Sequence, residues 1–318
     1  MTASTTSATA VSADLVSPPG LTRHAFAAMG TNVAVLVPSD RASEAAGVER
    51  LMLTWDSVCT RFDPDSELSR LNAAGGRPRI VSELLFEVLR TAQQAAWATN
   101  GLFDPTLLRS LEAIGYDRDF AALVEAPARR RAPAALPVTG GWRRLELDPA
   151  TRTARLPNGV GLDLGGLAKG MAVDAAIAGL RARDVTMAAV DAGGDLAVLA
   201  LPPDATAWPI AIDGPNGDRI VSLTSGGLAT SSVARRHWRQ GDVARHHLID
   251  PRSGLPSTSP LWSVSVAAAS CGQAEVAAKA AFLLGPDEGS SFLAGHGLAG
   301  LFLLPDGGER WAGRWSPS

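Results

Sequence analysis

The segment LDLGGLAKGMAVDAA at residues 162–176 places the strongest constraint on how this chain can fold. From Leu167 onward its apolar residues recur at helical spacing, which predicts a helix over residues 166–183. The glycine pair 165–166 therefore falls at a helix start, where unpaired backbone N–H groups and the helix dipole favour an anion. Lys169 adds a full positive charge to the first turn. The segment is typical of a phosphate-binding helix start; the alternative is an exposed lysine on an amphipathic helix whose glycines allow close packing.

The other predicted elements are grouped by type. β-branched residues predict a strand at 31–37, and apolar periodicity predicts helices at 40–58, 82–99 and 273–284. The Pro- and Arg-rich segment 124–141 is interpreted as an irregular surface excursion. Further short strands are predicted at 144–147, 153–156, 187–190, 209–212, 220–224 and 262–266. Strand runs separated from helix runs indicate an α+β fold and not a regular βαβ repeat.

Composition bounds the class of protein. A chain of 318 residues with 46% hydrophobic residues is ordinary for a globular protein with a core, and the net charge of −3 argues against a nucleic-acid binder. No apolar stretch is long enough to span a membrane. Residues 1–20 lack the features of a signal peptide. We expect a cytoplasmic protein with a disordered tail at 1–20, a single domain at 21–318, and two buried thiols at Cys59 and Cys271.

Three more glycine-rich or acidic turns follow the first. They are VDAGGDLAV at 190–198, SGGLATSS at 225–232, and HHLIDPRSGLP at 246–256. Each is more often structural than catalytic when taken alone, but four in one chain favour a ligand with several phosphates. The motifs GxGxxG, GxxxxGK[ST], HExxH and GxSxG are absent, which excludes the common Rossmann, P-loop, zincin and hydrolase interpretations.

The ordered set of motifs resembles the FAD:protein FMN transferases, the ApbE-like family. The matching pieces, in chain order, are AMGTNVAV, TRFDPDSELSRLNAAGG, NGLFDPTL, LDLGGLAKGMAVDAA, VDAGGDLAV, GGLATSS, HHLIDPRSG and AEVAAKAAFLLG. The resemblance implies an α+β fold related to the T-fold, with a flavin cleft between two lobes.

The resemblance also implies an activity. Such enzymes bind FAD as a substrate, transfer its FMN half to a threonine or serine hydroxyl of an acceptor flavoprotein, and release AMP, with Mg²⁺ in the site. Some members instead hydrolyse FAD to FMN and AMP. The implied partners are therefore FAD and a flavoprotein acceptor, with no nucleic acid and no membrane.

Residue roles carry over by motif position. In the implied roles, Met29 packs on the flavin, Phe62 lies beside the ring system, and His247 accepts a proton. The resemblance further implies cofactor contacts at Leu102, Phe103, Asp104, Asp163, Lys169 and Ile249, and metal contacts at the Gly166 carbonyl and at Glu275.

The late helix departs from the family pattern. Glu275 and Lys279 occupy positions where the family has an aspartate and a threonine that face magnesium. A charged lysine has no lone pair for a cation, and the i,i+4 spacing would let Lys279 pair with Glu275. Three hypotheses follow. Mg²⁺ still binds through Gly166, Glu275 and substrate phosphates with weakened catalysis; or Lys279 supplies the positive charge itself; or the chain binds FAD without catalysing transfer.

Overall fold

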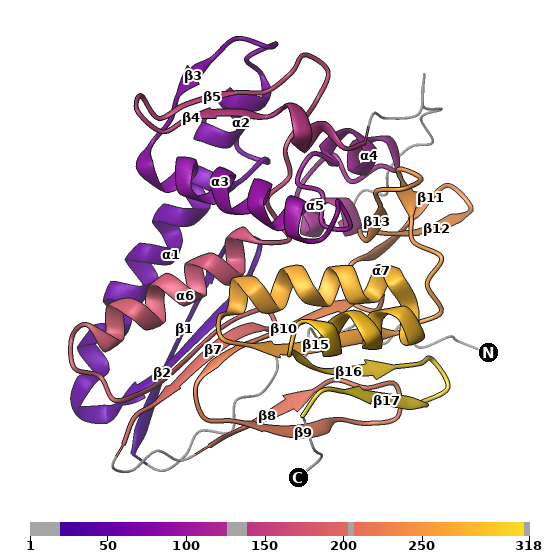
Figure 1. Cartoon of the computed structure of the whole chain (residues 1–318). Helices are drawn as coiled ribbons and strands as arrows, with labels where there is room; N and C mark the ends of the chain where they lie inside the picture. Colours follow the sequence, from indigo (N-terminus) through magenta and orange to yellow (C-terminus); the bar gives the residue numbers. More distant parts are fainter. Residues whose placement is uncertain (1–19, 126–138, 203–206, 315–318) are drawn as a thin grey trace.

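The computed structural model describes residues 20–125, 139–202 and 207–314 (Figure 1). Its centre is an eight-stranded sheet, antiparallel throughout, in the order β1-β2-β6-β7-β10-β15-β16-β17. The strands are β1 (Leu21–Ala28), β2 (Thr31–Pro38), β6 (Met187–Ala192), β7 (Asp195–Ala200), β10 (Gly226–Ser232), β15 (Ser263–Ala268), β16 (Ala299–Leu303) and β17 (Glu309–Ala312).

A two-residue turn joins the first two strands and places one predicted site residue. Met29 and Gly30 both have positive φ angles, 54° and 67°. That backbone matches the twist of the flanking strands in a tight hairpin. The Met29 amide donates to Oδ2 of Asp56 over 2.8 Å, so the turn is fixed against helix α1 (Ala45–Cys59).

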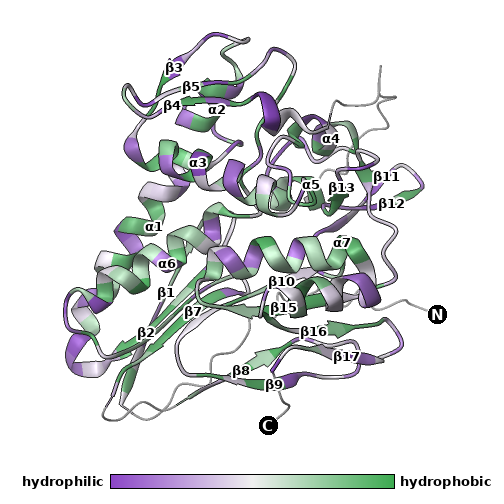
Figure 2. Ribbon diagram, in the orientation of Figure 1, coloured by the Kyte–Doolittle hydropathy of each residue, from purple (hydrophilic) through white to green (hydrophobic). Residues whose placement is uncertain are grey.

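The sheet is covered on both faces. Helices α1, α6 (Ala168–Arg181) and α7 (Cys271–Gly295) lie on one face, while the hairpin β8 (Trp208–Ile212)–β9 (Arg219–Leu223) covers the other (Figure 1). The central strands β6 and β7 are correspondingly apolar except at Asp191 and Asp195, next to the turn that joins them (Figure 2). Burial on both faces explains why the rest of each strand is a continuous apolar run instead of an alternating pattern.

A second lobe sits above the helical face of the sheet (Figure 1). Its apolar core includes Leu85, Leu89, Phe103 and Trp142. Its elements are α2 (Glu67–Asn72), α3 (Glu83–Ala98), α4 (Leu108–Ala113), α5 (Phe120–Glu125), the 3-10 helix η2 (Gly141–Arg144) and the small sheet β3 (Arg79–Ile80), β5 (Thr153–Arg155), β4 (Glu146–Asp148). The remaining short elements are the 3-10 helix η1 (Ser39–Glu44) and the hairpins β11 (His237–Gln240)–β12 (Val243–His246) and β13 (Ile249–Asp250)–β14 (Leu255–Pro256).

Helices α6 and α7 meet through glycine. A Cβ added to Gly170 would lie 2.8 Å from both the Cα and the nitrogen of Gly272. Next to this contact, Asp174 on α6 accepts hydrogen bonds from the amides of Cys271 (2.7 Å) and Gly272 (2.9 Å). A carboxylate of one helix thus caps the start of the other, where the helix dipole favours negative charge.

The sequence predicted the class and most helices of this fold. The α+β class is confirmed, and the predicted segments at 31–37, 82–99 and 166–183 correspond to β2, α3 and α6. Cys59 and Cys271 are buried and unpaired, as predicted. The tail at 1–20 lies almost wholly outside the described residues, as does most of the predicted excursion at 124–141. The assignment of 21–318 as a single domain stays a prediction.

Two segments interpreted as turns are largely strands. Much of 190–198 lies in β6 and β7, and much of 225–232 forms β10 in the middle of the sheet. The small residues of β10 serve packing: a Cβ on Gly227 would lie 2.1 Å from the nitrogen of Cys271. No helix in the described ranges combines the length and apolar composition that a bilayer crossing requires.

Replacing Gly170 by alanine tests the helix contact. The added methyl collides with backbone of α7, so we expect the free energy of unfolding to fall by about 1–3 kcal/mol. Gly179→Ala on the same helix is the matched control, because the only neighbour of its added Cβ is the flexible end of Arg183. Removing a helical glycine there should raise stability by up to about 1 kcal/mol. Urea unfolding measures both, and equal shifts for the two variants would contradict the contact.

Candidate functional site

A cavity of about 310 Å³ lies between the second lobe and the sheet. Its walls come from segments far apart in the chain, among them the hairpin turn at Met29, the start of α6, and the first half of α7. All of the site residues predicted from the sequence line it except Leu102, which is partly buried beside its neighbour Phe103. The fold therefore gathers the predicted residues around one space, while their individual roles stay predictions.

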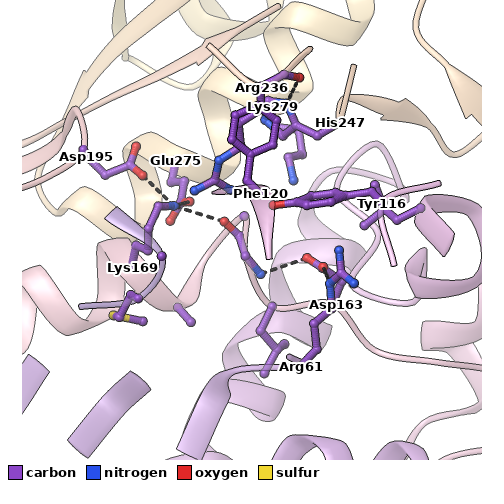
Figure 3. Close-up of a pocket in the computed structure, with 18 of the residues that line it drawn as sticks. Arg61, Tyr116, Phe120, Asp163, Lys169, Asp195, Arg236, His247, Glu275 and Lys279 are labelled. Atoms are coloured by element: carbon purple, nitrogen blue, oxygen red, sulfur yellow. Dashed lines mark hydrogen bonds and ion pairs between the residues drawn. The ribbon is translucent and has the colours of Figure 1, made fainter. Parts of the chain in front are cut away.

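Lys169 is held by three protein acceptors. Its Nζ lies 2.7 Å from Oδ2 of Asp195 on β7, 2.8 Å from Oε1 of Glu275 on α7, and 3.1 Å from the Gly165 carbonyl oxygen (Figure 3). Burial opposes its charged form, but the two carboxylates outweigh burial and raise the pKa of Lys169. An ammonium has three N–H donors. All three are engaged here, which leaves none for the phosphate contact predicted from the sequence.

Both oxygens of Glu275 are also engaged. Oε1 accepts from Lys169, and Oε2 accepts from the Gly170 amide over 3.1 Å. Burial raises the pKa of this carboxyl to about 7, against the opposing charge of Lys169. The i,i+4 pair with Lys279 that the spacing allowed does not form: among the described residues, the ion pair of Glu275 is with Lys169.

The Lys279 ammonium lies against Gly166. A Cβ added to Gly166 would be 2.1 Å from Nζ of Lys279, so the ammonium fills the space a side chain would need. Nζ is also 5.6 Å from the Phe103 ring centroid, within reach of a cation–π contact. Burial lowers the pKa of Lys279, while Asp163 and Glu275 oppose that shift.

These contacts do not fit a divalent metal ion at the predicted position. The Glu275 carboxylate already has two donors, and an ammonium occupies the space beside Gly166. Mg²⁺ prefers several oxygen ligands in near-octahedral geometry. Within the described part of the chain, no group of three or more His, Cys, Asp or Glu side chains is placed to hold a metal.

Asp163 is paired with Arg61, a residue to which the motifs assigned no role. Nε of Arg61 lies 2.6 Å from Oδ2 of Asp163, whose Oδ1 accepts from the Gly165 amide over 2.9 Å. Burial alone would raise the pKa of Asp163, but the charges of Arg61 and Lys279 outweigh it and lower that pKa.

The Arg61 side chain is only 6% exposed, and its guanidinium lies 4.2 Å from the Phe62 ring centroid and 4.6 Å from that of Tyr116. Nη2 of Arg61 is buried without a hydrogen-bond partner among the described residues. Buried donors are normally satisfied, so this one points to an absent acceptor.

Both carboxylate oxygens of Asp104 accept hydrogen bonds from neighbouring protein groups, so neither faces the cavity unbonded. Its Oδ1 accepts from the amide and the hydroxyl of Thr106 over 2.7 and 2.5 Å, and its Oδ2 accepts from the Gly140 amide over 2.7 Å. These bonds fix the FDPT turn that positions Phe103. Any contact of Asp104 with a cofactor would therefore reuse oxygens already engaged.

His247 is neutral in this environment. Burial lowers its pKa well below the usual value, and the positive charges of Arg236 and Lys279 lower it further. Nδ1 lies 3.4 Å from the Arg236 carbonyl oxygen. The tautomer that donates from Nδ1 leaves a lone pair on Nε2, and a neutral imidazole of this kind can accept a proton.

The structure adds four residues to the predicted site. Arg61 lies inside a quoted motif, and Asp195 lies inside a glycine turn already suspected of approaching a ligand. Tyr116 is the only tyrosine of the chain and lies 5.8 Å from Phe62, ring centroid to ring centroid. Arg236 had no sequence signal, because it is one arginine among many and only the fold brings it to the cavity.

The family model and the curated relatives that match this chain all belong to one family. The ApbE family model matches residues 29–302. An FAD:protein FMN transferase of Treponema pallidum is 32% identical over 281 residues, covering 80% of this chain and 75% of the relative. One from Vibrio cholerae is 26% identical over 273 residues, covering 83% and 81%.

Solved structures agree. The ApbE protein of Thermotoga maritima superposes with a TM-score of 0.82 at 28% identity, covering 92% of this chain and 97% of that one. The Pseudomonas stutzeri flavinyl transferase ApbE in its apo form gives a TM-score of 0.77 at 25% identity, covering 93% and 94%. The predicted fold class is thereby confirmed.

Removing the Lys169 ammonium tests the buried cluster. Lys169→Met leaves Glu275 and Asp195 without their shared cation, so we expect the free energy of unfolding to fall by about 3–5 kcal/mol. Arg109→Met is the control, because Arg109 pairs with Glu112 at the surface. An exposed pair contributes about 1 kcal/mol or less. Urea unfolding compares the two, and similar losses would show that the buried cluster contributes no more than a surface pair.

Proposed function

Because this chain belongs to the ApbE family, we propose that it is an FAD:protein FMN transferase. It moves FMN from FAD to a threonine or serine hydroxyl of an acceptor flavoprotein and releases AMP. One observation carries the proposal for this chain in particular. A neutral histidine, His247, shares a cavity with a cationic Lys279 and with the glycine-led start of α6.

The chemistry of this site divides into a base and a set of positive groups. Nε2 of His247 takes the proton from the acceptor hydroxyl as the hydroxyl oxygen forms a bond to the phosphorus of the FMN half. The bond between that phosphorus and the bridging oxygen breaks, and its electron pair leaves with AMP. Charge that builds on the phosphoryl oxygens is stabilised by donors fixed in advance by the fold.

The flavin contacts use the apolar and aromatic wall of the cavity. Met29, Phe103 and Ile249 line this wall and offer packing surface, and Phe62, 37% exposed, remains available to a planar ring. Tyr116 extends the same aromatic surface behind Phe62. Leu102 supports this wall through its neighbour Phe103.

Asp163 acts through Arg61. Its carboxylate holds the guanidinium in place, so that the unpartnered Nη2 can donate to a carbonyl or phosphate oxygen of FAD. Asp163 therefore contributes to FAD binding by orienting a donor.

The expected Mg²⁺ is not supported by the contacts of Glu275 and Gly166. No step above depends on a metal ion. The cytoplasmic location, the absence of a nucleic-acid partner and the acceptor flavoprotein stay predictions from the sequence.

The function is tested with FAD and a flavin-free acceptor subunit that carries a known flavinylation threonine. The expected result is AMP in the supernatant together with flavin fluorescence of the acceptor band on a denaturing gel. FMN and AMP without a fluorescent band would indicate FAD hydrolysis, which is the pyrophosphatase alternative. FAD binding without AMP would indicate a non-catalytic flavin-binding protein.

His247→Gln should separate binding from chemistry. We expect AMP release to fall by about 10²–10⁴-fold, because a general base is lost, while the Kd for FAD changes little. The control is His246→Gln, since His246 bonds the Ser257 carbonyl (3.1 Å) and is absent from the cavity lining. Chromatography of AMP and fluorescence quenching of FAD measure the two quantities. Equal losses of AMP release in both variants would contradict the role of His247.

The pH profile gives a second test of His247. The base works only when neutral, and its pKa is lowered well below the ordinary value of 6.5. The acid limb of kcat/KM should therefore lie below pH 6.5, with full activity retained at that pH. An acid limb centred above 6.5 would show that the base is another group or that His247 is not in this environment.

Arg61→Met should weaken FAD binding by about tenfold or more, because a hydrogen bond from a charged donor contributes about 1.5–3 kcal/mol. Arg70→Met is the control, since Arg70 is 54% exposed and pairs only loosely with Asp65. Quenching of flavin fluorescence gives both Kd values. An unchanged Kd for Arg61→Met would remove this residue from the FAD site.

A further inference from the structure

The chain contains only two lysines, and both line the cavity. Of its 29 basic residues, 27 are arginine, and the two exceptions are Lys169 and Lys279. Every basic position outside the cavity is an arginine. An ammonium is a compact point charge with three rotatable donors, whereas a guanidinium is a wide planar fork. The two lysines therefore occupy the positions where a small cation is specifically accommodated.

The two lysines differ in how many protein hydrogen-bond acceptors surround their ammonium groups. Lys169 has three protein acceptors for its three donors. Lys279 has no hydrogen bond and no ion pair with any residue in the described ranges, and its ammonium lies against Gly166 and near the Phe103 ring. The nearby carboxylates are already committed, Glu275 and Asp195 to Lys169 and Asp163 to Arg61.

A second donor at the same point is also unused. Gly166 is buried, and its amide N–H has no hydrogen-bond partner among the described residues. The Lys279 ammonium lies directly over this glycine. Two neighbouring donors without a protein acceptor in the described ranges are thus available to an acceptor from a ligand.

We propose that Lys279 is the resident cation of this site, which binds the pyrophosphate of FAD in place of a divalent metal ion. The inference rests on the proposed function for the identity of the ligand. The ammonium donates to non-bridging phosphate oxygens, and the Gly166 amide adds a second donor. FAD binding and AMP release then need no added metal. The proton of the attacking hydroxyl still goes to His247, and the electron pair of the broken phosphorus–oxygen bond still leaves with AMP.

Because the chain has only two lysines, chemical modification of their amines tests the proposal without a measurement of turnover. Reductive methylation with formaldehyde and a borane reductant should modify Lys279, which lines the cavity and has no hydrogen-bond acceptor among the described residues. Lys169 is the internal control, because its nitrogen is fully hydrogen-bonded and should stay unmodified. Mass spectrometry reports each site. FAD added with EDTA should protect Lys279, and protection only with Mg²⁺ present would overturn the proposal.

Binding and product formation are measured in parallel, in EDTA and in excess Mg²⁺. Wild-type protein should bind FAD with the same Kd in both, within about twofold, if the ammonium replaces the ion. Lys279→Met should raise the Kd at least about tenfold in both buffers, because a charged donor is lost. Lys279→Arg should also weaken binding, because a planar guanidinium is wider than the space that the ammonium fills beside Gly166. Circular dichroism establishes that each variant is folded, and the wild-type protection result is independent of any variant.

The outcomes separate this inference from the proposed function. Metal-independent FAD binding with protection of Lys279, but no AMP in either buffer, would support Lys279 as the resident cation and refute the transferase activity. AMP release and acceptor fluorescence that both require Mg²⁺ would support the transferase activity and overturn the role of Lys279. An unchanged Kd in a folded Lys279→Met variant would overturn it as well.

Discussion

The buried contact of one ammonium with two carboxylates is the interaction on which this site depends. Lys169 on α6 bridges Asp195 on β7 and Glu275 on α7, and the Gly170 amide completes the contacts of Glu275. Removing Lys169 would leave two buried carboxylates without their cation, which costs more than the intact cluster contributes. The cluster thereby fixes the two helices and the sheet relative to one another at the floor of the cavity.

Close packing of small residues makes that cluster possible. α6 and α7 approach until Gly170 meets Gly272, and Gly227 lets the start of α7 lie on β10. Larger side chains at these positions would separate the elements and lengthen the ion pairs. The glycines that suggested ligand-binding loops in the sequence thus serve two purposes. Some admit a ligand, and others let three elements come close enough to share buried charges.

The division of roles between the two lysines follows from where acceptors lie. Lys169 is surrounded by three oxygen acceptors, so its ammonium holds protein elements together and does not bind a ligand. Lys279, on the neighbouring helix α7, faces Gly166 and the Phe103 ring. Its N–H donors therefore stay available to a ligand. The surroundings of His247 also depend on the tertiary structure, because burial and then the positive charges of Arg236 and Lys279 lower the pKa of its imidazole. A site with a free cation beside a neutral base is suited to attack on a phosphorus atom.

The sequence determined the fold class, the family and a set of residues that nearly all line the cavity, because helical periodicity and ordered motifs are local properties of the chain. It could not show that 225–232 is a buried strand, since small residues favour a strand only when neighbouring elements pack on them. It also could not show which lysine is free. The partners of Lys169 include Glu275, 106 residues away, so the hydrogen bonds that immobilise one ammonium and leave the other available exist only in the tertiary structure.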